Sequence, residues 1–203
     1  MTSLLSKVIA CSLLLIGCNT KKAIDSEDIS VNSFPITLEN AIEMEQNIGS
    51  KDISYEYTVG IDTSLYPNKA HFRLTNVKRF LRSSADEGME YTLEYYATSD
   101  DSVRTILHEW DVAEVANDSV SVNSASPRTN IIKTFDRKFS TLDLTFTKLL
   151  GTPSVRNIKS KFLEETERDD VKWQRLNQLN AYLLMFKRDI DTYRQIRLIV
   201  YPK

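Results

Sequence analysis

The hydrophobic residues between positions 126 and 150 recur at steps of three and four, which places them on one face of a helix. Ser126 followed by Pro127 is typical of a helix start, and Thr129 or Asn130 is the alternative cap. Gly151 and the proline two residues later predict the end of this helix. The residues on its apolar face are Ile131, Ile132, Phe135, Phe139, Leu142, Phe146, Leu149 and Leu150.

Apolar and polar residues alternate in several other segments, with the two-residue period of a half-buried strand. Before the long helix, this pattern predicts strands at residues 53–59 and through Phe72 and Leu74. It also predicts a hairpin over residues 89–112 whose turn is Thr98 to Ser102. After the helix, it predicts a three-strand meander made of Val171–Leu176, Asn180–Arg188 and Arg194–Tyr201.

Two shorter segments have helical spacing instead. Leu38, Ile42 and Ile48 predict a short helix that Thr37 caps and Gly49 ends. A second short helix is predicted at residues 158–163, from the spacing of Ile158, Phe162 and Leu163.

These elements predict an α+β fold, because strands cluster on either side of a helical middle without regular βαβ alternation. We expect an antiparallel sheet of about six to seven strands. One long helix, at about 126–150, and one or two short helices would pack on one face of it. Residues 34–203 contain no linker rich in proline, glycine or serine and no internal repeat, so they are expected to form a single domain.

The first residues of the chain have the form of an export signal. Lys7 is followed by the apolar run Val8–Ile16, which is too short for the roughly 20 residues that cross a bilayer as a helix. Leu15-Ile16-Gly17-Cys18 resembles the lipobox of bacterial lipoproteins. That resemblance implies that residues 1–17 are removed and that Cys18 carries acyl chains such as palmitate. The alternative is an ordinary secretory signal with an incidental Cys18, but no small-x-small cleavage site follows the apolar run.

Residues 18–33 lack aromatic residues and any hydrophobic period, which is typical of a flexible tether. Its ends would lie about 20 Å apart on average. Asn19 stands where an aspartate often signals inner-membrane retention, so we expect a lipoprotein of the outer membrane. The sequence does not say whether the domain faces the periplasm or the cell surface.

Charge and cysteine content exclude several classes of partner and chemistry. Loss of Lys7 with the signal changes the formal charge from −2 to −3, which argues against nucleic acid as a partner. Cys11 lies in the signal and Cys18 is the lipid site, so no thiol is left for a disulfide, a zinc site or a nucleophile. We expect no cofactor and no bound metal.

The two histidines, His71 and His108, are the candidate general bases of an enzyme. His108-Glu-Trp-Asp begins like the zinc-protease motif, but Val112 occupies the position of its second histidine. No Gly-x-Ser-x-Gly segment exposes a serine, and the glycines are too far apart for a phosphate loop. The acidic run Glu164–Asp170 lacks the spacing of a calcium loop and is interpreted as a solvated helix end. A non-enzymatic role is therefore expected.

Aromatic residues are the remaining candidates for ligand binding. If they shared one exposed sheet face, they would form a stacking platform for a sugar or a peptide. Packing in the core is the alternative, because strands favour aromatic residues. The candidates are Tyr55, Tyr57, Tyr91, Tyr95 and Trp110, with Tyr96 and Trp173 as further members.

The sequence thus predicts a lipid-anchored protein of the cell envelope, with a non-catalytic domain that binds a protein or glycan partner. One alternative is an immunity lipoprotein that neutralises a toxin delivered to the periplasm. Another is an unrecognised hydrolase with His71 or His108 as its base.

Overall fold

A computed structural model describes most of the chain after residue 33. For residues 125–128 and 163 it describes the backbone alone. The proposed lipidation site Cys18, together with Tyr57 and His71, lies outside the described residues. The described residues are 34, 36–55, 74–84, 86, 88–113, 125–163, 165–174, 179–188 and 193–202.

The described chain contains the same order of elements twice, a helix followed by four strands. The first half is α1(Leu38–Asn47), β1(Lys51–Asp52), β2(Leu74–Arg82), β3(Met89–Thr98) and β4(Val103–Val112). The second half is α2(Ala125–Leu150), β5(Val155–Leu163), β6(Thr166–Trp173), β7(Asn180–Arg188) and β8(Tyr193–Tyr201). No repeat is visible in the amino-acid sequence, so the two halves share their topology without sharing a sequence pattern.

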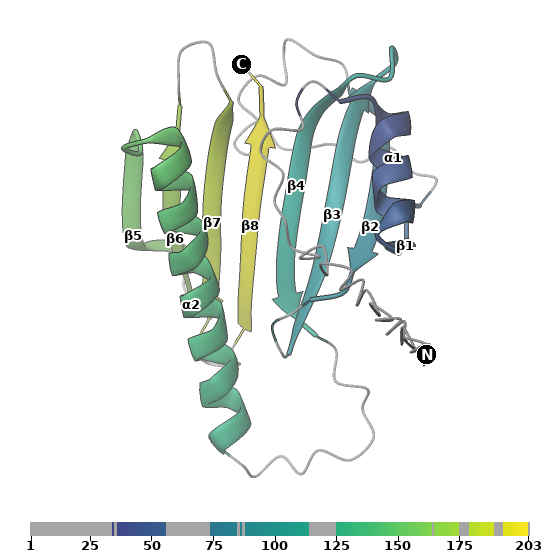
Figure 1. Ribbon diagram of the computed structural model, residues 1–203. Helices are drawn as coiled ribbons and strands as arrows, with labels where there is room; N and C mark the ends of the chain where they lie inside the picture. The colour runs from purple at the N-terminus through teal and green to yellow at the C-terminus, as the bar shows by residue number, and fades with distance from the viewer. Residues whose placement is uncertain are drawn as a thin grey trace, which may run out of the picture.

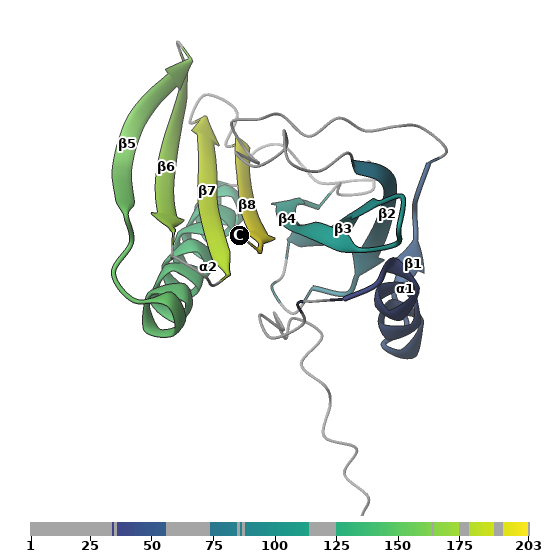
Figure 2. The ribbon, with the colours of Figure 1, turned by 90° about the horizontal axis from the view of Figure 1, so that it is seen from above.

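All eight strands form one antiparallel sheet in the order β1-β2-β3-β4-β8-β7-β6-β5. Each half is therefore a meander, and the halves join where β4 pairs with β8, for example at Trp110↔Ile196. Both helices lie on the same face of the sheet (Figures 1 and 2). We call it the helix-covered face, and its opposite the helix-free face.

The short helix α1 has the caps that the sequence predicted. The Thr37 hydroxyl oxygen accepts a hydrogen bond from the backbone N–H of Asn40 at 3.2 Å. Gly49 adopts a φ of 79°, which residues with a side chain rarely adopt, and this ends the helix. Leu38, Ala41 and Glu45 are its buried residues, and the helix packs against β2 and β3.

The long helix α2 packs against β6, β7 and β8. Its buried residues follow the predicted three- and four-residue steps, and Phe146 meets Trp173 of β6 at a ring-centroid distance of 5.8 Å. Gly151, with a φ of 80°, ends the helix and donates its N–H to Thr147 O at 2.8 Å. The buried side chains are Phe135, Phe139, Leu142, Phe146 and Leu150.

The predicted fold class is wrong in its architecture. The sheet has eight strands rather than six or seven, and the described chain has two helices. Residues 158–163, predicted as a short helix, lie in strand β5, so the second half is a four-strand meander. Of the predicted strand 53–59, residues 53–55 follow the short β1 without continuing it, and residues 56–59 lie outside the described residues.

The predicted structure of the acidic run Glu164–Asp170 is also wrong, because its residues 166–170 belong to strand β6. Asp169 and Asp170 lie in β6 and are buried, at 3% and 4% exposure, rather than on a solvated helix end. The Asp169 carboxylate lies 2.5 Å from Lys187 Nζ, and that of Asp170 lies 2.7 Å from Arg168 Nε. These cations make the burial tolerable, because a buried charge is stable only when it is paired.

Each face of the sheet carries its own apolar cluster, because successive side chains of a strand point to opposite faces. The larger cluster lies on the helix-covered face and includes Trp110, Trp173 and the buried residues of α2. The smaller cluster lies on the helix-free face. Its buried members are Tyr96, Leu107, Leu184, Ile199 and Tyr201.

Candidate binding surface

Four aromatic side chains on the helix-free face of β5–β8 are each covered by a cation. The distances from the cation to the ring centroid are 4.8 Å for Arg168 and Phe162 and 5.3 Å for Lys172 and Tyr182. For Arg197 and Phe186 the distance is 5.7 Å, and for Arg188 and Tyr193 it is 5.3 Å. We call these eight residues the cation–aromatic surface.

Strand register brings these residues together. Arg168 of β6 stands opposite Phe186 of β7, and Lys172 stands opposite Tyr182. The ring of Phe162 on β5 meets the ring of Phe186 edge-on, with centroids 5.4 Å apart. Alternation along β7 places Tyr182, Leu184 and Phe186 on this one face, with the buried Leu184 between the two rings.

The cation–aromatic surface is partly open to solvent. Phe162 is 46% exposed, and Tyr182, Phe186 and Tyr193 are half-buried. Arg168 pairs with the carboxylate of Asp170 at 2.7 Å, and Arg197 pairs with the carboxylate of Glu109 at 2.7 Å. The cations that rest on the rings, with Lys172 over Tyr182 as one example, are the groups of this surface that an anionic ligand would meet.

Burial changes the acid–base properties of two groups at this surface. The pKa of the Tyr182 hydroxyl is raised by burial and by the neighbouring carboxylate of Asp170. The pKa of Glu109 is raised by burial, although the charge of Arg197 acts in the opposite direction. Tyr182 is therefore a neutral hydrogen-bond donor near neutral pH.

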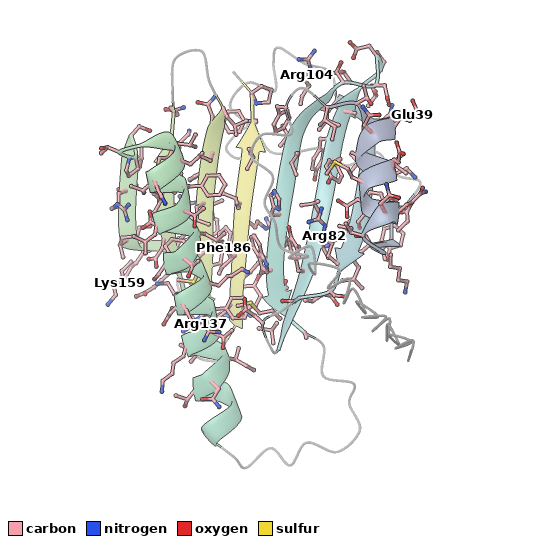
Figure 3. The ribbon with its side chains drawn as sticks, viewed as in Figure 1. Glu39, Arg82, Arg104, Arg137, Lys159 and Phe186 are labelled. Carbon is pink, nitrogen blue, oxygen red and sulfur yellow. The ribbon has the colours of Figure 1, made fainter. Side chains whose placement is uncertain are left out.

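A second polar arrangement lies on the helix-covered face, beneath α1, and we call it the buried glutamate cluster (Glu45, Ser50, Arg82 and Tyr95). The fully buried Glu45 accepts hydrogen bonds from Arg82 at 2.5 and 2.9 Å, and from the Ser50 and Tyr95 hydroxyls at 2.6 Å each. Burial alone would raise the pKa of Glu45, but Arg82, Ser50 and Tyr95 bring it below its usual value. Figure 3 shows Arg82 on the side of the sheet that carries α1. The carboxylate is saturated with donors, so the cluster fixes α1 to the sheet.

His108, a predicted candidate base, lies beside this cluster. Its ring stacks with those of Tyr91 and Trp110, at centroid distances of 6.1 and 6.0 Å, and its Nδ1 lies 2.8 Å from the Tyr91 hydroxyl. Burial, together with the charge of Arg82, lowers the pKa of His108 to about 3. The ring is neutral and 5% exposed, so it is poorly placed to exchange a proton with a substrate.

The predicted stacking platform is wrong. Tyr91, Tyr95 and Trp110 are at most 2% exposed and belong to the core of the helix-covered face, as does Trp173. Tyr96 is buried on the other face. Tyr55 is 66% exposed, and Tyr57 lies outside the described residues. A platform needs several exposed rings on one face, and burial removes all but one of the described candidates.

The aromatic residues of the cation–aromatic surface were not among the candidates that the sequence suggested. Phe162 was part of a predicted helix, and Tyr182 and Phe186 lay in a predicted strand with apolar residues on both faces. Their only sequence signal is the presence of cations, Arg168 and Lys172, in the preceding strand. That signal becomes visible only when the register of β6 and β7 is known.

Among the described residues, no three His, Cys, Asp or Glu side chains are grouped so that they could hold a metal ion. None of the helices in this part of the chain is both long enough and apolar enough to span a membrane. No family model, no curated protein and no solved structure matches the chain.

Proposed function

We propose that this protein is a lipid-anchored protein of the bacterial cell envelope whose domain binds a partner without catalysis. The observation that carries the proposal is the cation–aromatic surface, where four rings and four cations share the helix-free face of the second half. Partly exposed aromatic residues and arginine are the side chains most enriched at binding surfaces.

The chemistry of this surface favours a partner that carries acidic groups. An arginine or lysine that rests on a ring is held in place, at a gain of about 0.5–1 kcal/mol at an exposed site. A cation fixed in this way loses less freedom when it binds a carboxylate or phosphate. The rings add apolar contact area around each charge. An anionic protein or glycan fits both features.

The proposed anchor is the one that the sequence predicts, with acyl chains on Cys18 and the tether 18–33 leading to the domain. The chain joins the fold beside the turn between β3 and β4, because Val103 N–H bonds Ile36 O at 3.0 Å and Leu38 N–H bonds Asp101 O at 2.9 Å. The cation–aromatic surface belongs to the other half of the sheet, so a partner bound there need not displace the anchored end.

In-cell crosslinking with the full-length protein tests this function. A photo-crosslinking amino acid at Tyr182 is expected to capture a discrete partner, whereas the same amino acid at Glu43, exposed on α1, should not. Lys172→Glu, which reverses the charge over the Tyr182 ring, should abolish the captured species and leave the circular dichroism spectrum unchanged. Equal capture at both positions, or capture that survives Lys172→Glu, would overturn the proposal.

A further inference from the structure

The two edges of the sheet are built differently. The edge strand β1 has two residues, whereas β5 at the other edge has nine. An edge strand presents backbone N–H and C=O groups that no neighbouring strand uses, and an extended segment of another chain can pair with them. The length of β5 makes it the edge of this sheet that can accept such a strand.

Side chains along β5 favour a particular kind of partner. Val155, Ile158 and Phe162 are 38%, 48% and 46% exposed, which is unusual for large apolar residues. The strand also carries three cations and no acidic residue. Arg156 is bound to Asp143 of α2 at 2.5 and 2.8 Å, while Lys159 and Lys161 are exposed. Figure 3 shows Lys159 projecting from this edge of the sheet.

A bulge gives β5 a fixed shape. Ile158 and Lys159 together stand opposite Asp169, and Lys159 has a φ of 57°. The buried Asp169 carboxylate accepts the Lys159 backbone N–H at 2.6 Å, and the Ser160 hydroxyl donates to Arg168 O at 2.7 Å. These two bonds hold Lys159 and Ser160 beside β6 before any partner arrives, and the register shifts once more between Lys161 and Leu163.

We propose that β5 is a docking edge that adds an extended, acidic segment of a protein partner to the sheet as a ninth strand. This inference rests on the proposed binding function and names the class of its partner. A second copy of this chain is a poor occupant, since pairing β5 with β5 would bring the cations of both strands together. A segment that alternates acidic and apolar residues places carboxylates near Lys159 and Lys161 and apolar side chains near Phe162.

The docking edge is continuous with the cation–aromatic surface. Phe162 belongs to both, because its ring lies under Arg168 and against Phe186. A strand added to β5 therefore places its side chains on the helix-free face beside Phe162. Backbone pairing supplies affinity in such complexes, and the side-chain contacts supply specificity.

Peptide binding to the full-length lipidated protein in detergent micelles tests this inference. The probe is a fluorescent peptide in which glutamate alternates with valine. Its controls are a peptide with lysine in place of glutamate and an acidic peptide N-methylated at alternate residues. The acidic peptide should bind and slow amide hydrogen exchange at residues 155–163. Both controls should bind at least about tenfold more weakly, since one repels the cations and the other cannot form the backbone bonds.

Charge reversal locates the binding site. The double variant Lys159→Glu, Lys161→Glu should weaken binding by about tenfold or more. The matched double variant Lys133→Glu, Lys148→Glu reverses two exposed lysines of α2 and should bind as the natural protein does. Absence of binding, equal binding of the lysine peptide, or protection outside residues 155–163 would overturn the docking edge. If the crosslinks at Tyr182 persist in that case and still depend on Lys172, the proposed binding function stands.

Discussion

Glu45 on α1 and Arg82 on β2 form a buried ion pair with two hydrogen bonds, at 2.9 Å from Nε and 2.5 Å from Nη2. Their side chains are 0% and 6% exposed. Such a pair joins the helix to the sheet through charge as well as through apolar packing. Because the Ser50 and Tyr95 hydroxyls bond the same carboxylate, its removal would leave several buried donors without an acceptor.

Glu45→Gln should therefore destabilise the domain by about 3–5 kcal/mol, the usual cost of a buried charge left without its counter-ion. Glu43→Gln is the matched control, because Glu43 is exposed on the same helix, and it should change stability by less than about 0.5 kcal/mol. Urea unfolding followed by circular dichroism measures both. Similar values for the two variants would mean that the pair does not hold α1 in place.

Burial of His108 predicts a loss of stability in mild acid. The folded state keeps the pKa of His108 at about 3, whereas the unfolded chain binds the proton near pH 6.5. The unfolded state therefore binds more protons between these values, and stability falls as the pH drops below about 6.5. This group contributes a loss of about 2 kcal/mol between pH 7.5 and pH 5.

The variant His108→Gln tests this dependence, since glutamine can accept the Tyr91 hydrogen bond but does not titrate. The urea midpoint should depend less on pH in the variant than in the natural protein over this range. The Glu45 carboxylate affects stability at lower pH than His108 does. Because the fold lowers the pKa of Glu45, the stabilisation by this carboxylate is lost only below about pH 4.5. Identical pH dependence in both proteins would show that His108 titrates normally in the fold.

Two neighbouring residues of α2 should differ sharply in their effect on stability. Phe146 is fully buried against Trp173, so Phe146→Ala should cost about 3–5 kcal/mol through lost packing and a cavity. Leu144 is 71% exposed, and Leu144→Ala should cost less than about 0.5 kcal/mol. Thermal unfolding compares them directly. A large loss with Leu144→Ala would indicate that another surface covers this side of α2.

The lipid anchor is tested by the only two cysteines of the chain. Cys18→Ala should move the protein out of the membrane fraction and abolish incorporation of a labelled fatty acid. Cys11→Ala is the control, because this residue lies in the segment that processing removes, and the protein should remain in the membrane fraction. If the Cys18 variant still sediments with membranes, lipidation is not what holds the protein there.

The sequence predicts a helix well where one face alone is buried, and α1 and α2 show this. The buried face of α2 contacts the sheet, and the three- and four-residue steps between its apolar residues identify that face in the sequence. These residues are Phe135, Phe139, Leu142 and Phe146. The caps are equally local, because the Thr37 hydroxyl and the left-handed Gly49 act within a few residues of the helix that they bound.

The sequence did not predict strand β5, because irregularities in its pairing interrupt the alternation of apolar and polar residues along the strand. Val155 and Phe162 lie on the helix-free face, and an uninterrupted strand would space its apolar residues by even numbers. The register against β6 shifts twice, between Asn157 and Ser160 and between Lys161 and Leu163, so the even spacing is lost, and Ile158, Phe162 and Leu163 have a spacing that a helix also allows. The bulge depends on Asp169 of the next strand, so no local pattern could reveal it.

The aromatic candidates failed for a different reason. Alternation showed that Tyr91 and Tyr95 share a face of their strand, but which face the core covers depends on where the helices pack. The partial exposure of the aromatic residues of the cation–aromatic surface depends in the same way on pairing between distant strands. Both questions are decided by strand order, and a single sequence carries little information about it.

The joining of the two halves through β4 and β8 has a mechanical consequence. Ile36 and Leu38, the first residues of the fold, bond the first half beside the β3–β4 turn, and the proposed partner surface lies on the second half. Tension between the membrane and a bound partner would therefore pass across the β4–β8 ladder, where Arg197 holds Glu109 at 2.7 Å. Beside this ladder, Asp86 of the first half binds Arg137 and Lys138 of α2 at 3.0 and 3.3 Å. The β4–β8 ladder and the ion pairs of Asp86 with α2 are thus the contacts between the two halves that such tension would load.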